Sequence, residues 1–361
     1  MRNSLAIIGS SIIHDNDIKE YIIRFFSKKN IKPDSLFLLE DSQKDFIFEI
    51  ENLKPSTKNI YICADKKNYA TIAKMCSTLI QDSLQNINDY LVPSLSSFAK
   101  NGRAFSVEYK EFFISVFCID ESLEIEALLE SNFEQEIIHI FNLDLESARL
   151  FIEPLGESFD LSLCFYELIN GYVICEVRSC NKAHIDEFLE SVSKLLGEKI
   201  IIAEDIAEFL IKKLSSKNKT LTFAESCTGG ALSYRFAKIP GCSNILEGSI
   251  VSYSNRIKNI WLEVDESILD RLGAVSGECV EAMAKGALNL SGADFAISIS
   301  GIAGPSGATP NKPVGTVFVC AASRDGDIRV DRHLFSGDRE LVQQKSVHAA
   351  IYALTEIVKT I

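Results

Sequence analysis

Apolar segments with the pattern of strands alternate with amphipathic helical segments over the first 80 residues of the chain. We predict strands at 5–9, 35–39 and 59–64, and helices at 17–28, 45–53 and 69–79. Strands that are joined through helices pair in parallel, and a parallel sheet is covered by helices on both faces. This order therefore predicts an α/β domain built on a parallel sheet.

The pattern changes twice further along the chain, which predicts three domains. Strands 105–109, 111–119 and 136–141 and helices 123–131 and 145–152, the last ending before Pro154, complete an α/β domain over 1–155. A hairpin that turns at Asn170-Gly171, followed by helix 184–196, predicts a small β-β-α connecting domain over 156–200. Residues 201–361 form the third domain, in which strands again alternate with helices.

Charge and glycine are divided unequally between these parts. Residues 1–200 carry a net charge of −12 and residues 201–361 a net charge of −1, whereas fourteen of the 19 glycines lie after residue 200. Because glycine lets the backbone approach a ligand closely, a small-molecule site is expected in the C-terminal part. The total charge of −13 argues against a nucleic-acid partner bound by a basic surface.

Hydropathy and cysteine usage indicate the compartment. No apolar run approaches the about 20 residues of a membrane span, and the N-terminal apolar segment is too short for a signal peptide. The ten cysteines are scattered without a CxxC pair, which is typical of reduced, buried thiols. We therefore expect a soluble, cytoplasmic protein with no membrane partner.

Polar residues gather where the predicted strands of the last domain end. Four segments show this pattern: AESCTGG at 224–230, VSYSNRIK at 251–258, SISGIAGP at 298–305 and SGDR at 336–339. The carboxyl ends of strands form the usual ligand crevice of α/β folds, and helix N-termini favour anions. Taken singly, Ser226 is explained as a turn residue and Lys258 as a solvated charge. Their joint placement at such ends predicts a binding or catalytic site.

The segments AESCTGG, GSIVSYSN, GAVS, SISGIAGP, KPVGTV and SGDR occur in the order and at the spacing of the CinA family. From about 203 to 361 the chain resembles the C-terminal α/β/α domain of competence/damage-inducible CinA proteins, which also exists as a stand-alone nicotinamide mononucleotide (NMN) amidohydrolase. The resemblance implies hydrolysis of NMN to nicotinate mononucleotide and ammonia. It also implies a homodimer. We expect neither a cofactor nor a metal, since the five histidines are scattered.

The resemblance also implies roles for individual residues. Amide hydrolysis needs a nucleophile, a base and donors to the oxyanion. We hypothesise that Ser226 attacks, with Lys258 as the base, alone or with Tyr253; in the alternative, Ser226 and Lys258 position a water without an acyl-enzyme. Arg339 is expected to hold the 5′-phosphate. The substrate-binding residues are then Ser300, Arg339, Thr228, Gly229, Gly230, Gly301, Gly304 and Gly337.

Cys227 is a competing nucleophile by residue type alone. A catalytic cysteine usually has a histidine partner that lowers its pKa, and no histidine lies in any of the motifs. The neighbouring Ser226 also carries the role that the resemblance implies. We therefore favour the serine.

Longer CinA proteins carry an N-terminal domain that resembles molybdopterin-binding proteins, and residues 1–155 look like a diverged version of it. The family marks that site with a loop close to TGGLGPTxDDxT, whereas residues 62–69 here are ICADKKNY. Without the glycines and the acidic pair, the ADP-ribose pyrophosphatase activity of the family is not expected. His14, Asp15 and Asp17 are an alternative metal site, but a helix cap explains the aspartates. An adaptor function in competence or DNA damage is the alternative to an enzyme.

Overall fold

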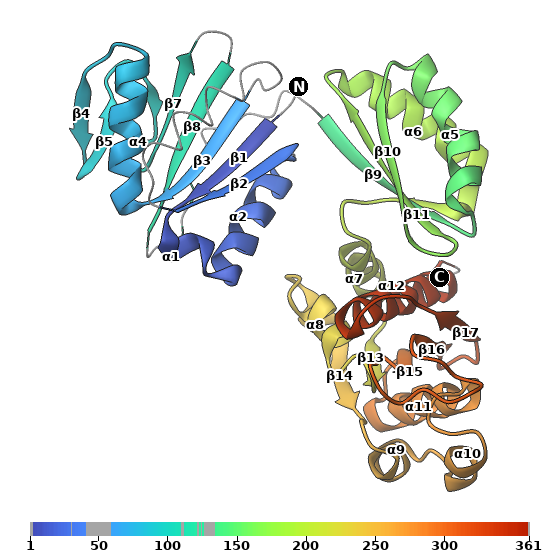
Figure 1. Cartoon of the computed structure of the whole chain (residues 1–361). Coiled ribbons are helices and arrows are strands. Elements are labelled where there is room, and N and C mark those ends of the chain that lie inside the picture. Colours follow the sequence, from blue (N-terminus) through green and yellow to red (C-terminus); the bar gives the residue numbers. More distant parts are fainter. Residues whose placement is uncertain are drawn as a thin grey trace. The chain divides into compact units, whose positions relative to one another are not determined.

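The computed structural model describes residues 3–29, 31–40, 59–109, 112–120, 123, 125 and 134–359. The chain divides into two compact units, Met1–Glu134 and Gln135–Ile361, which are described separately (Figure 1). The predicted helix 45–53 and nearly all of the predicted helix 123–131 lie outside the described residues.

The first unit is built on a six-stranded sheet with the strand order β2-β1-β3-β8-β7-β6. The first four strands in this order are parallel, and β7 and β6 continue the sheet in antiparallel pairs. The strands are β1 (Asn3–Ile8), β2 (Ser35–Leu39), β3 (Asn59–Asp65), β6 (Ser97–Phe98), β7 (Ala104–Tyr109) and β8 (Phe112–Ile119). The helices are α1 (Ser10–Ile13), α2 (Asn16–Lys28) and α4 (Lys66–Leu79), and a separate hairpin joins β4 (Leu84–Ile87) to β5 (Tyr90–Pro93). The predicted parallel α/β fold is confirmed.

Alternate residues of β1 supply both cores of this unit. Leu5 and Ile7 belong to the core that contains Phe26 of α2, while Ala6 and Ile8 belong to the core formed with α4. Successive side chains of a strand point to opposite faces, so a strand buried on both sides reads as a continuous apolar run. This is why the sequence pattern identified β1 and β3.

The second unit begins with a four-stranded sheet in the order β10-β11-β9-β12. Its strands are β9 (Glu134–Phe141), β10 (Ser162–Ile169), β11 (Tyr172–Ser179) and β12 (Ile200–Ile202), and its helices are α5 (Leu145–Ser158) and α6 (Lys182–Leu196), which leads into a short 3-10 turn, η1 (Gly197–Lys199). Both helices pack on one face of the sheet. The predicted hairpin is confirmed, with Gly171 at a φ of 81°.

Two details of the prediction are wrong in this region. The predicted strand 136–141 and helix 145–152 belong to this sheet and not to the first domain, so the boundary lies near residue 134 instead of between 155 and 156. Helix α5 also continues through Pro154 to Ser158. Pro154 has no backbone N–H to donate to the carbonyl oxygen of Leu150, which lies on the exposed side of α5. Ile152 and Gly156 stay buried on the other side of the helix.

The other face of this small sheet packs against the C-terminal domain and shares its core. Phe141, Tyr172 and Ile174 belong to the same cluster as the apolar residues of α7 (Ile206–Ser216) and α12 (Arg339–Val358). The ring of Phe141 stacks on Tyr172 and on Tyr352, at centroid distances of 4.7 and 5.7 Å. Residues 135–361 therefore form one continuous structure.

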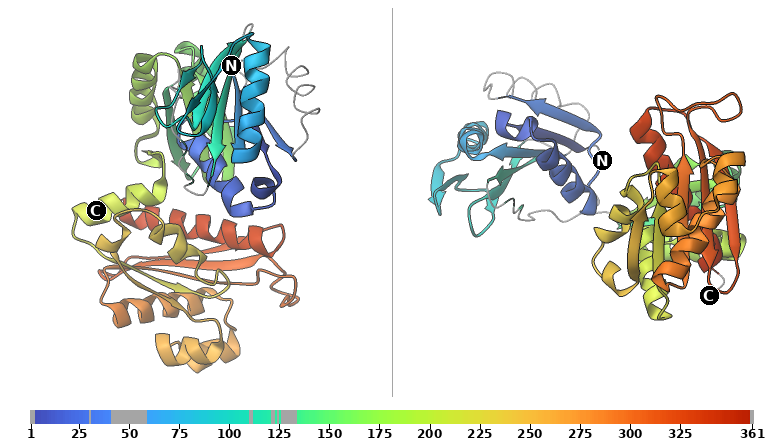
Figure 2. Two further views of the ribbon diagram at one scale, coloured as in Figure 1. Left: turned by 90° about the vertical axis from the view of Figure 1, so that its left-hand side faces the viewer. Right: turned by 90° about the horizontal axis from the view of Figure 1, so that it is seen from below.

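The C-terminal domain is a five-stranded sheet between two layers of helices, in the order β14-β13-β15-β16-β17. The strands are β13 (Leu221–Glu225), β14 (Leu246–Val251), β15 (Phe295–Gly301), β16 (Thr316–Ser323) and β17 (Ile328–Leu334). The helices are α7, α8 (Ala231–Ala237) and α12 on one face, and α9 (Asn255–Leu262), α10 (Glu266–Arg271) and α11 (Gly277–Ser291) on the other, with a 3-10 turn η2 (Cys242–Asn244). Figure 2 shows α12 and α11 on opposite sides of this sheet. The first three strands are parallel, and β16 and β17 are antiparallel additions.

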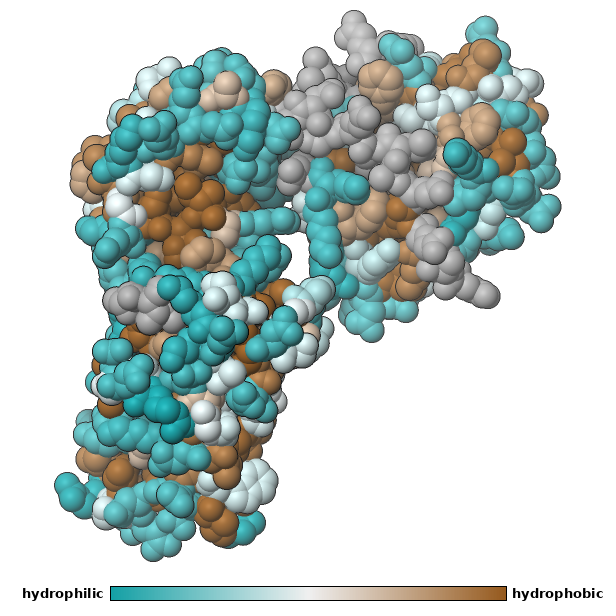
Figure 3. Space-filling model, turned by 180° about the vertical axis from the view of Figure 1, so that it is seen from behind, coloured by the Kyte–Doolittle hydropathy of each residue, from teal (hydrophilic) through white to brown (hydrophobic). Residues whose placement is uncertain are grey.

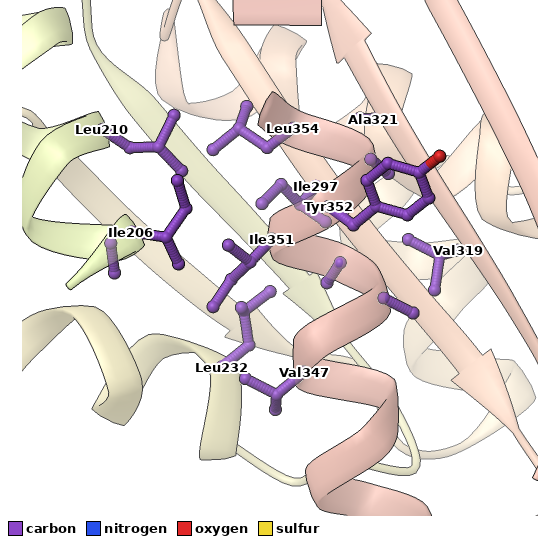
Figure 4. Packing of buried hydrophobic residues seen from close by; sticks show 14 of the residues in the cluster. Ile206, Leu210, Leu232, Ile297, Val319, Ala321, Val347, Ile351, Tyr352 and Leu354 are labelled. Carbon is purple, nitrogen blue, oxygen red and sulfur yellow. The ribbon is translucent and has the colours of Figure 1, made fainter. Parts of the chain in front are cut away.

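Helix α12 lies at the centre of the larger core of this domain. Val347, Ile351 and Leu354 lie between the side chains of α7 and α8 and those of the sheet (Figure 4). Side chains cap two helices of this domain: Asp338 accepts from the backbone of Leu341 at the start of α12, and Ser276 accepts from the backbone of Cys279 at the start of α11.

The surface seen in Figure 3 is mostly hydrophilic, with apolar residues in separate patches. Among the helices in the described part of the chain, none has both the length and the apolar character that a bilayer crossing requires.

Candidate active site

The parallel strands of the C-terminal domain bring three serines to one edge of the sheet. Glu225, the last residue of β13, is in register with Val251 of β14 and with Ile299 of β15. The residues that follow these three positions are Ser226, Ser252 and Ser300. The predicted meeting of the polar segments at the carboxyl ends of the strands is confirmed by this register.

Lys258 projects from the first turn of α9 onto Ser226. Its Nζ lies 3.0 Å from Ser226 Oγ, 2.6 Å from the carbonyl oxygen of Ser252 and 3.3 Å from that of Tyr253. Lys258 is fully buried, and Ser226 is 8% exposed. An ammonium group has three donors, and these three oxygens account for all of them.

The surroundings of Lys258 favour a neutral amine. Burial lowers the pKa of Lys258, and smaller contributions from the thiols of Cys279 and Cys227 act in the opposite direction. Within the described ranges, no carboxylate forms an ion pair with this lysine. A neutral amine would donate its two hydrogens to the two carbonyl oxygens and offer its lone pair to the hydroxyl proton of Ser226. That is the arrangement of a general base beside a nucleophile.

A pocket of about 290 Å³ opens beside this pair, close to the lower size limit for small-molecule sites. It is lined by Ser226, Cys227, Tyr253, Lys258, Ala274, Val275, Ser300, Gly301, Ile302, Ala303, Gly304, Ser306, Gly307 and Arg339. Gly301 is needed at the end of β15, because a Cβ there would lie 2.8 Å from Val317 Cγ2 and 3.1 Å from the Cys227 sulfur. The pocket therefore combines the strand ends with the loop that follows β15.

Seven of the predicted site residues meet in this pocket and four do not line it. Ser226, Tyr253, Lys258, Ser300, Gly301, Gly304 and Arg339 line it. Thr228 instead donates from Oγ1 to the carboxylate of Glu225 at 2.7 Å. Gly229 and Gly230, both at positive φ, form the turn before α8, and Gly337 lies against Leu341 at the start of α12. A part for these four residues in substrate binding stays a prediction.

Tyr253 and Arg339 face each other at the mouth of the pocket. Arg339 donates from Nη2 to the hydroxyl of Tyr253 at 2.8 Å and from Nη1 to the carbonyl oxygen of Gly304 at 2.9 Å. The Tyr253 side chain is 59% exposed. It is the backbone carbonyl of Tyr253, and not its hydroxyl, that contacts Lys258. The geometry therefore favours Lys258 alone as the base.

Cys227 also lines the pocket, but its chemistry is that of a buried thiol. Burial raises the pKa of Cys227 to about 12, so the thiol stays protonated at neutral pH. The thiolate is the nucleophilic form of cysteine. This supports the choice of Ser226 over Cys227.

Two contributors to the site were missed by the sequence argument. Gln343 donates from Nε2 to the carbonyl oxygen of Cys227 at 2.6 Å, and it lies one helical turn after Arg339 on α12. The spacing of four residues after SGDR was a signal for this contact. Glu225 is fully buried directly before Ser226, which its charge alone did not indicate.

Asp15, one of the candidate metal ligands near the N-terminus, has another structural role. Asp15 accepts from the backbone of Asp17 and Ile18 and caps α2, as expected for a helix start. Asp65, in the segment that replaces the family loop, caps α4 through the backbone of Asn68. In the described part of the chain, no group of three or more His, Cys, Asp or Glu side chains is arranged to hold a metal ion.

Comparison with known proteins places this domain in a family. A family model described as the CinA C-terminal domain matches residues 203–358. The solved competence damage-inducible protein A of Klebsiella pneumoniae is 36% identical, and the match covers 42% of this chain and 93% of that one, with a TM-score of 0.41. Residues 203–358 therefore belong to the CinA C-terminal domain family. The competence/damage inducible protein CihA of Agrobacterium tumefaciens is 32% identical, with coverages of 42% and 93% and a TM-score of 0.42.

Curated relatives are also CinA-like proteins. Those of Thermosipho melanesiensis and Thermotoga maritima are 42% and 41% identical over 179 and 186 residues, about half of this chain and 44% of each relative. The CinA-like protein of Syntrophotalea carbinolica is 37% identical over 225 residues, 60% of this chain and 54% of that protein. The matched part of the chain thus spans about half the length of these relatives.

Proposed function

We propose that the CinA domain of this chain hydrolyses the carboxamide of NMN to nicotinate mononucleotide and ammonia. The observation that carries the proposal is the buried contact of 3.0 Å between Lys258 Nζ and Ser226 Oγ at the edge of the pocket. Membership of the CinA family supports it, because the family resemblance implies this substrate.

The chemistry proceeds in two steps. The neutral amine of Lys258 takes the hydroxyl proton as Ser226 Oγ attacks the carboxamide carbon. The resulting ammonium returns the proton to the leaving nitrogen, so ammonia departs and an ester to Ser226 remains. A water, deprotonated by the same lysine, then attacks the ester carbon; the lysine returns this proton to Ser226 Oγ as the ester bond breaks, and the released acid ionises to the carboxylate.

Two further residues fit the demands of this reaction. Ser300, buried at the end of the neighbouring strand, lines the pocket and can donate its hydroxyl proton to the oxyanion. Arg339 lies at the mouth of the pocket, and the planar fork of its guanidinium group can donate two hydrogen bonds to a phosphate. In the alternative mechanism Ser226 and Lys258 position the attacking water; intact-mass measurement during the first turnover distinguishes the two, because only the serine mechanism yields an acylated chain.

The proposal is tested by ammonia release from NMN with the full chain, beside Ser226→Ala and Ser323→Ala. Ser323 is a buried serine at the opposite end of β16 and bonds to Asp327. We expect a loss of at least about 100-fold for Ser226→Ala and none for Ser323→Ala. Unchanged release by Ser226→Ala would remove the serine from the chemistry. A folded parent that releases no ammonia would contradict the amidohydrolase proposal and favour the adaptor.

A further inference from the structure

Glu225 is a fully buried carboxylate directly before Ser226. No cation forms an ion pair with it among the residues that the structure describes. Burying a charge without a counter-ion is strongly unfavourable unless hydrogen bonds replace the water that is lost. An apolar residue of similar size would avoid that cost, so the carboxylate needs an explanation.

Five hydrogen bonds take the place of water around this carboxylate. Its Oε2 accepts from Thr228 Oγ1 at 2.7 Å and from the backbone of Gly230 and Leu232 at 3.0 and 3.1 Å. Its Oε1 accepts from the backbone of Ser233 at 2.9 Å and from Ser249 Oγ at 3.3 Å. Four of the five donors therefore belong to the turn after Ser226 and to the start of α8.

The backbone of Glu225 is connected to Lys258. The carbonyl oxygen of Glu225 accepts from the backbone of Ser252 at 2.8 Å. The carbonyl oxygen of Ser252 in turn accepts from Lys258 Nζ at 2.6 Å, and this nitrogen reaches Ser226 Oγ. These three hydrogen bonds and the peptide bond between Glu225 and Ser226 therefore close a ring that contains Glu225, Ser252, Lys258 and Ser226.

We propose that Glu225 is the positioning residue of the Ser226–Lys258 pair. Its carboxylate fixes the turn after Ser226 by accepting hydrogen bonds from that turn. Its backbone carbonyl fixes Ser252, whose own carbonyl oxygen accepts a hydrogen bond from Lys258. Glu225 does not line the pocket, so it acts through Ser226 and Lys258 and not on the substrate. This inference rests on the proposed function, in which the distance between serine and lysine sets the rate of attack.

The closest test is Glu225→Gln, which keeps the shape of the side chain. The amide offers one acceptor oxygen instead of two, so an NH₂ group must face either the Ser233 backbone or the donors from Thr228, Gly230 and Leu232. The turn must then shift to avoid a contact between two donors. A displacement of the nucleophile by about 1 Å can cost on the order of 100-fold in rate.

The variants are compared by kcat and KM for ammonia release from NMN. We expect Glu225→Gln to lower kcat by about 10- to 100-fold with KM changed by less than about threefold. Thr228→Val removes one donor to the carboxylate and should lower kcat by a smaller factor. Asp294→Asn is the matched control: Asp294 accepts from Lys219 Nζ and the backbone of Thr220 at the opposite end of the same strands. It should lower thermal stability and leave kcat unchanged.

A second readout separates this inference from the identity of the substrate. An alkyl fluorophosphonate reacts with an activated serine, whose oxygen displaces fluoride while the lysine takes the proton. Mass spectrometry then gives the labelling rate of Ser226 in each variant. If the parent is labelled but releases no ammonia from NMN, the proposed substrate fails, and slower labelling of Glu225→Gln still supports the positioning role.

Two outcomes would overturn the inference. In the first, both Glu225→Gln and Thr228→Val keep the kcat of the parent and its rate of Ser226 labelling. The other is a parent whose Ser226 reacts with neither reagent, which would contradict both proposals. If Glu225→Gln does not fold, Thr228→Val provides the test, because it removes only the hydroxyl group that donates to the Glu225 carboxylate.

Discussion

Lys258 Nζ lies 3.0 Å from Ser226 Oγ, although the two residues are 32 positions apart in the chain. The lysine is fully buried, and its other two contacts are uncharged carbonyl oxygens. A buried lysine without a counter-ion loses its proton more easily than an exposed one. The pair is therefore arranged for a serine that is activated by a neutral amine, and this has consequences for pH dependence.

The first prediction concerns the pH profile of the reaction. Burial lowers the pKa of Lys258, so the neutral, basic form gains population below the ordinary lysine pKa. We expect kcat/KM for NMN to rise with pH and to level off below about 10.4, the ordinary value. Lys258→Met should lose about 100- to 10,000-fold in kcat. An inflection at the ordinary value, or a profile that Lys258→Met leaves unchanged, would contradict a base role for this lysine.

The lowered pKa of Lys258 also makes the stability of the folded chain depend on pH. Between the lowered pKa of folded Lys258 and the ordinary value of about 10.4, the unfolded chain binds more protons than the folded one, so the free energy of unfolding rises with pH. Lys258→Met lacks this rise. In urea titrations we expect the stability of Lys258→Met relative to the parent to be highest below the folded pKa and to fall as the pH approaches the ordinary value. A difference that is independent of pH would argue against burial as the cause.

Cys227 provides a test of nucleophile identity. Burial raises the pKa of its thiol to about 12, so at neutral pH the sulfur is neither charged nor reactive. We expect Cys227→Ala to keep kcat for NMN within about threefold of the parent, in contrast to Ser226→Ala. Iodoacetamide should likewise leave the folded parent active. Loss of activity in Cys227→Ala comparable with that in Ser226→Ala would reverse the assignment.

Arg339 is expected to act on binding of the phosphate group. Removing a charge-assisted hydrogen bond costs about 1.5–3 kcal/mol, which corresponds to a rise in KM of about 10- to 150-fold. We expect this rise for NMN in Arg339→Gln and a smaller one in Arg339→Lys, which keeps the charge but not the fork. Nicotinamide riboside lacks the phosphate and serves as the matched substrate. An equal effect of Arg339→Gln on both substrates would place the phosphate elsewhere.

The shared core predicts that residues 135–361 unfold together. Phe141, in the small sheet, is fully buried against Tyr172 and Tyr352. Phe141→Ala should cost about 3–5 kcal/mol. Trp261, the single tryptophan, lies on α9 and reports on the C-terminal domain. We expect its fluorescence transition in urea to shift with Phe141→Ala and not with Phe105→Ala, a buried substitution in the first unit. An unmoved transition in Phe141→Ala would show that the small sheet folds separately.

Local chemistry made many elements predictable. Helices α11 and α12 begin at the caps Ser276 and Asp338, and the hairpin turns at Gly171, because each of these features depends on a few neighbouring residues. Strand β9 was also found, but its assignment to the first domain was wrong. A strand pattern shows that one face is buried and does not show which strand pairs with it, so only long-range pairing assigned β9 to the second sheet.

The sequence by itself determined the α/β class, the positions of most strands and helices, and the motifs whose residues meet at the strand ends. Only the tertiary structure decided that Lys258 is buried and reaches Ser226, and that the hydroxyl of Tyr253 faces Arg339. It also decided that the Glu225 carboxylate accepts hydrogen bonds from the turn after Ser226. Propensity and periodicity act over a few residues, and therefore they can be read along the chain. Burial, and with it the pKa of a lysine, arises from segments far apart in sequence that exclude water together.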